Sequence, residues 1–72
     1  RKLRDLFGLT AAETRVAVAL FEGLSPTETA PAYGVSLNTV RAPLGSIFQK
    51  TDTRRQSELV ALMTRTVTAA LD

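Results

Sequence analysis

The chain has 72 residues and a formal net charge of +2, with no cysteine and no histidine. This length limits it to one domain, and the composition excludes disulfides and thiolate metal sites and removes the commonest general base. A domain this short buries only about 60% of the surface that its unfolded chain exposes, so its core must be compact and local. No apolar run reaches the roughly 18 residues of a membrane span, and nothing at the start resembles a signal peptide.

Residues 1–8 mix basic and apolar side chains, and we interpret them as the end of a linker. A chain that begins at Arg1 without Met is expected to be a fragment of a longer protein, of which residues 9–72 form the domain. The carboxylates are scattered, and no nucleophile stands beside a base. The sequence therefore predicts neither an enzyme, a metal site nor a bound cofactor.

The first helix is predicted over residues 11–22. Thr10 and Glu13 have the spacing of a capping box, in which each side chain accepts from the other residue's amide. Gly23 then ends the segment. A second capping box, Ser25 and Glu28, starts a short helix that must stop by Gly34.

A third helix is predicted over residues 37–50 with Ser36 as its cap, and a fourth over residues 55–70 after a polar break. Strand alternation is missing. The sequence thus predicts an all-α, four-helix bundle-like domain containing a helix-turn-helix. The residues expected in its core by periodicity are Val16, Leu20, Phe21, Val35, Val40, Leu44, Ile47, Leu59 and Leu62.

Basic residues gather in the second half of the domain. Residues 9–35 carry Arg15 as their single basic residue against three glutamates, whereas residues 36–56 carry four basic residues against Asp52. A basic face is the usual footprint of phosphate binding, and chance clustering on a solvated surface is the alternative.

The middle of the chain has the spacing of a helix-turn-helix: a short helix, a tight turn containing Gly34, and a longer helix capped by Ser36. Such a pair lays its first helix across the DNA backbone and its second in the major groove. The residues that carry a family resemblance are Leu9-Thr10, Glu13, Gly23-Leu24-Ser25, Glu28, Ala30, Gly34-Val35-Ser36, Thr39-Val40-Arg41, Leu44, Ile47-Phe48, Lys50-Thr51, Arg55-Gln56 and Glu58-Leu59-Val60.

Together these residues resemble the LuxR-type (GerE-like) helix-turn-helix domain over about residues 9–63. Region four of sigma factors resembles the same stretch, but the continuation from Lys50 to Val60 favours the LuxR type. The resemblance implies the C-terminal, DNA-binding domain of a cytoplasmic bacterial transcription regulator, preceded by a receiver or other sensor domain. It also implies no cofactor.

The resemblance assigns roles to individual positions. Arg41 stands where the family has a base-reading Lys or Arg, for which a bidentate contact to guanine is the natural chemistry. Lys50 matches a phosphate contact. The whole set expected to bind double-stranded DNA is Ser36, Asn38, Thr39, Arg41, Ala42, Gly45, Lys50, Arg54, Arg55 and Gln56.

The fourth helix of the family makes the dimer contact on DNA, so a homodimer that binds a roughly palindromic site is expected. If Leu59, Leu62 and Val67 face the core, other apolar residues of this helix lie partly outside. The residues expected at the dimer interface are Val60, Met63, Thr64 and Val67.

Three residues depart from the family pattern. Pro31 and Pro43 fall inside the second and third helices, where a proline costs about 3 kcal/mol and can kink the helix or tighten its first turns. Thr29 replaces an apolar residue, which predicts a thinner core near Pro31. Either the third helix still binds DNA, or the domain is a protein-interaction or dimerisation module whose DNA binding has degraded.

Overall fold

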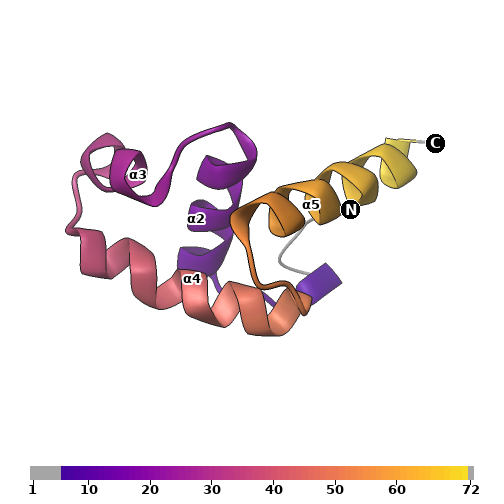
Figure 1. The fold of residues 1–72 in the computed structure, drawn as a ribbon, viewed down its shortest axis with the longest axis horizontal. Helices are drawn as coiled ribbons and strands as arrows, with labels where there is room; N and C mark the ends of the chain where they lie inside the picture. Colours follow the sequence, from indigo (N-terminus) through magenta and orange to yellow (C-terminus); the bar gives the residue numbers. More distant parts are fainter. Residues whose placement is uncertain (1–5, 72) are drawn as a thin grey trace.

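The computed structural model describes residues 6–71, and within them the chain is all-helical and has no strand. Its helices are α2 (Ala11–Phe21), α3 (Pro26–Tyr33), α4 (Leu37–Thr51) and α5 (Gln56–Leu71) (Figure 1). The predicted all-α class is confirmed, and each predicted helix end differs from the observed one by a single residue at most. No helix in this part of the chain is long and apolar enough to cross a membrane.

The first two of these helices begin with the capping boxes that the sequence predicts. The Thr10 hydroxyl accepts from the Glu13 amide at 3.1 Å, and Glu13 Oε1 accepts from the Thr10 amide at 2.8 Å. Ser25 and Glu28 make the same reciprocal pair at 3.1 and 2.8 Å. Two of the amides left free at each helix start are thereby satisfied, which fixes where α2 and α3 begin.

Two residues in the left-handed conformation end the helices of the central pair. Gly34 closes α3 with a φ of 67°, as the sequence predicts for a residue without a Cβ. Asp52 closes α4 with a φ of 54°, which is uncommon for a residue other than glycine. Residues 34–36 thus make a short turn that leads from α3 directly into α4.

The core lies where α2 packs against α4 and α5, with α3 covering α2 and α4. Figure 1 shows α2 between the other helices, while the C-terminal turns of α5 extend away from them. Among residues 6–71, no buried side-chain nitrogen or oxygen lacks a hydrogen-bond partner. The buried apolar residues are Leu9, Val16, Ala17, Ala19, Leu20, Ala30, Val40, Ile47, Leu59 and Met63.

Most of the predicted core is confirmed, with half-buried Val35 and Leu44 packed against it. The prediction that Phe21 belongs to the core is wrong, because 38% of its surface is exposed. It is the last residue of α2 and lies at the edge of the face that Val16 and Leu20 bury. Leu62 is half-buried rather than a core residue.

Thr29 lies in the interior of the protein although it is polar. It is fully buried, and its hydroxyl donates to the Ser25 carbonyl at 2.8 Å. A buried hydroxyl is costly only when it lacks a partner, and this one is bonded within its own helix.

Neither interior proline ends its helix, since α3 continues across Pro31 and α4 across Pro43. Each proline leaves the carbonyl four residues earlier without its usual amide partner. Those carbonyls belong to Thr27 and Thr39, which are both exposed.

Candidate nucleic-acid interface

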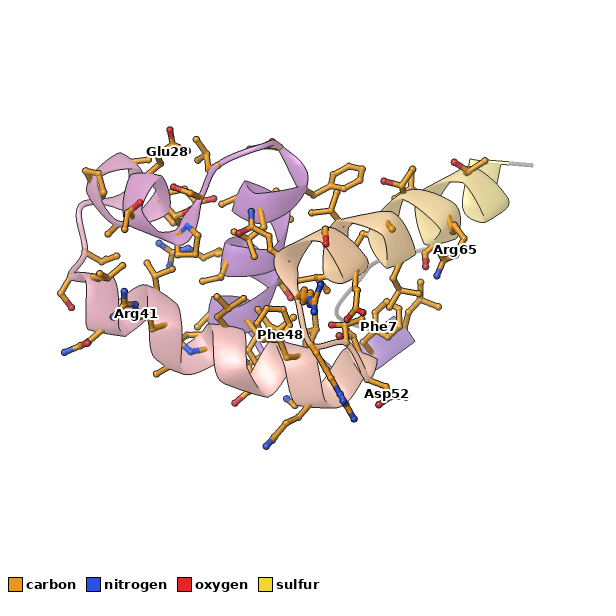
Figure 2. The ribbon with its side chains drawn as sticks, in the orientation of Figure 1. Phe7, Glu28, Arg41, Phe48, Asp52 and Arg65 are labelled. Atoms are coloured by element: carbon orange, nitrogen blue, oxygen red, sulfur yellow. The ribbon has the colours of Figure 1, made fainter. Side chains whose placement is uncertain are left out.

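One face of α4 points to solvent and carries the residues predicted to contact bases. Asn38, Arg41, Ala42 and Gly45 are all exposed, and their spacing of three or four residues aligns them along one side of the helix. The opposite side buries Val40 and Ile47 against α2. Figure 2 shows Arg41 on the half of α4 nearer to α3, with Asp52 at the other end.

The exposed face offers one long cationic side chain beside small residues. Ala42 and Gly45 present almost no side-chain bulk, and a Cβ at Gly45 would meet no atom within 4 Å. A surface of this kind permits a close approach by a large rigid partner while Arg41 supplies planar N–H donors. These three residues and Asn38, all four in the predicted DNA-binding set, therefore lie on the surface of α4.

The start of α4 differs electrostatically from the starts of the other helices. Ser36 caps it by accepting from the Thr39 amide at 3.2 Å, and the Ser36 and Thr39 hydroxyls lie 2.9 Å apart. The first turn of α4 contains no carboxylate, whereas α2, α3 and α5 each have a glutamate there. The positive end of the α4 dipole is therefore not compensated by a carboxylate of its own first turn.

Lys50 is exposed, but its ammonium is already bound by two groups of the protein. Its ammonium donates to Glu13 Oε1 at 2.7 Å and to the Gly8 carbonyl at 3.0 Å, which ties the end of α4 to the start of α2. The hydrogen bond from Lys50, followed by that from the Thr10 amide, lowers the pKa of Glu13. One of the three ammonium protons of Lys50 is left for an external acceptor.

The segment before α5 carries two exposed arginines, Arg54 and Arg55. Their backbone amides donate to Glu58 Oε1 at 2.8 and 3.2 Å, and these bonds, led by that from Arg54, lower the pKa of Glu58. Sequence reasoning missed this cap. The signal was the glutamate three residues after Arg55, although no serine or threonine stands at the cap position.

Gln56 is placed differently from the two arginines. It is half-buried, and its amide nitrogen donates to the Leu24 carbonyl at 3.3 Å. This bond ties the start of α5 to the connection between α2 and α3. The structure therefore gives Gln56 a role inside the fold, where the resemblance implied a contact to DNA.

The predicted dimer interface needs one correction. Met63 is only 1% exposed and belongs to the core, because Leu59 and Met63, four residues apart, form the side of α5 that faces inward. Val60 is half-buried and packs against the core. Thr64 is exposed and Val67 is 36% exposed, so these two remain on the surface.

Sequence reasoning also missed Arg15 as a candidate site residue. Its guanidinium lies over the ring of Tyr33, with the guanidinium carbon 5.5 Å from the ring centroid. Such a pair cannot be read from the sequence, because the two residues stand on separate helices.

Among residues 6–71, no group of three His, Cys, Asp or Glu side chains is placed to hold a metal ion. Comparison with known protein families, curated proteins and solved structures finds no match for this chain. The assignment of function therefore depends on the geometry of α3, α4 and the residues around them.

Proposed function

We propose that this domain binds double-stranded DNA in a sequence-specific manner, with α4 in the major groove. The observation that carries the proposal is the exposed face of α4, where Arg41 stands beside Ala42 and Gly45. A helix with this face fits a groove about 12 Å wide, and an arginine is the side chain that most often contacts guanine there.

Two further features support the same partner. The uncompensated start of α4 favours an external anion. Arg54 and Arg55 are exposed at the start of α5, and their side chains add two positive charges beside α4 that can bind phosphate. Both features suit the phosphate backbone beside a bound α4.

The resemblance to the LuxR-type domain also suggests a role for the domain in the cell. The domain would be the output domain of a bacterial transcription regulator, acting in the cytoplasm beside an N-terminal sensor or receiver domain. It would bind DNA as a homodimer through α5, with Val60, Thr64 and Val67 as the candidate contact residues.

The test is a titration of the domain against a pool of random duplex DNA at two salt concentrations. The matched variants are Arg41→Ala and Arg65→Ala, which remove the same charge from α4 and from α5. We expect wild type and Arg65→Ala to select a common motif and to weaken steeply with salt. Arg41→Ala should lose preference at one position of that motif, at a cost of about 1–3 kcal/mol.

Absence of DNA binding by the wild-type domain would refute the proposal. In that case the protein-interaction module becomes the candidate, and the exposed side of α5 with Val67 is the surface on which to seek a partner.

A further inference from the structure

Arg15 of α2 is held in place by Tyr33 of α3 through two contacts. The ring of Tyr33 lies beneath the guanidinium, 5.5 Å from its carbon, and the Tyr33 hydroxyl donates to the Arg15 carbonyl at 3.2 Å. The backbone carbonyl of Arg15 thus fixes the position of the Tyr33 ring, and this ring in turn fixes the position of the Arg15 guanidinium. This mutual support restricts the rotamers of a side chain that is otherwise exposed.

The pair lies beside the start of α4. Arg15, Tyr33 and Thr39 line one small hollow of about 70 Å³, together with Val35 and Val40. Three helices therefore meet here, and Arg15 borders the half of α4 that also carries Arg41. The exposed face of α4 points away from α2, and Arg15 lies next to Thr39 at the start of α4, beside that face and not part of it.

The hydrogen-bonding capacity of Arg15 is largely free. A guanidinium over an aromatic ring uses its face, which leaves the N–H donors at its edge for another acceptor. Within residues 6–71 the ion pair that forms joins Lys50 to Glu13, and no carboxylate pairs with Arg15. Arg15 is thus a positioned cation without a paired carboxylate among residues 6–71, in contrast to Lys50.

We propose that Arg15 contacts a DNA backbone phosphate at the edge of the groove that α4 enters. This inference depends on the proposed DNA binding and adds a contact from α2 to it. A phosphate fits better than a base, because Arg15 lies beside the exposed face of α4, and an arginine binds phosphate oxygens through paired N–H donors. The contact orients the domain on the duplex and carries no sequence information.

The experiment measures duplex affinity over a range of salt concentrations for wild type, Arg15→Gln and the control Arg65→Gln. Each variant removes one positive charge from an exposed position. Arg15→Gln should weaken binding to all duplexes by a similar factor and reduce the slope of log affinity against log salt by about 0.9, the value for one phosphate. Arg65→Gln should leave the slope unchanged.

A third variant, Arg15→Lys, separates loss of charge from loss of structure. It keeps the charge, so the salt slope should return to the wild-type value, and thermal unfolding of all variants checks that each one folds. The Arg15 proposal is overturned if wild type binds DNA and Arg15→Gln has the same affinity and slope. A wild-type domain that does not bind DNA at all overturns the proposed function itself.

Discussion

Gly34 and Gly45 should respond to alanine in opposite directions, although both lie in the helix-turn-helix. Gly45 is inside α4, on its exposed side, and an added Cβ would meet no atom within 4 Å. Only helix propensity then changes, and alanine is favoured over glycine by about 0.8–1.0 kcal/mol in a helix interior. Gly34 has a φ of 67°, where a side chain costs roughly 1–2 kcal/mol.

Urea and thermal unfolding followed by far-UV circular dichroism measure both effects. For a domain of this size, 1 kcal/mol moves the Tm by about 4–8 °C, so Gly45→Ala should raise the Tm and Gly34→Ala should lower it by a comparable or larger amount. A fall in stability for Gly45→Ala would refute the reasoning, because it would mean that the glycine has a backbone role in α4. A rise for Gly34→Ala would refute the left-handed cap.

Three further predictions concern packing, protonation and the proline of α4. Met63→Ala should lower the free energy of unfolding by about 2–5 kcal/mol in urea, while Val67→Ala should change it by less than about 0.5 kcal/mol; equal effects would contradict the observed register of α5. Hydrogen bonds lower the pKa values of Glu13, Glu28 and Glu58. The contribution of these three carboxylates to the free energy of unfolding is therefore present above the ordinary pKa of 4.5 and is lost as the pH falls below it. A Tm that stays constant from pH 6 down to about pH 3 would contradict this. Pro43→Ala should raise the Tm, because its amide can pair with the Thr39 carbonyl, with an upper bound of about 3 kcal/mol; a lower Tm would show that the ring packs usefully.

The sequence predicts the helices well because their starts are encoded by neighbouring residues. Thr10 with Glu13, and Ser25 with Glu28, need no information from elsewhere in the chain. The register of α5 is harder to predict. Leu59, Leu62, Met63 and Val67 allow more than one apolar face, and the choice of Leu59 with Met63 is made by packing against α2.

For the candidate site, the sequence predicts which side chains are exposed, but it does not predict which of them have a partner inside the protein. The exposure of Arg41, Ala42 and Gly45 follows from the burial of Val40 and Ile47 on the opposite side of one helix. The partners of Lys50 and Gln56 do not follow, because Glu13 and Leu24 are more than thirty residues away along the chain. Charged and amide side chains are assigned from sequence by residue type, but only the fold decides whether an internal partner reaches them first.

Helix α4, which carries the proposed contact surface, has the lowest helix propensity in the domain, because it contains both Pro43 and Gly45. Its persistence as a single helix is best explained by tertiary packing, which normally outweighs propensity in short helices. Val40 and Ile47 anchor its middle in the core, and the bond from Lys50 to Glu13 anchors its end. The inward side therefore holds α4 in place, and this leaves the outward side free to carry small residues and the exposed Arg41.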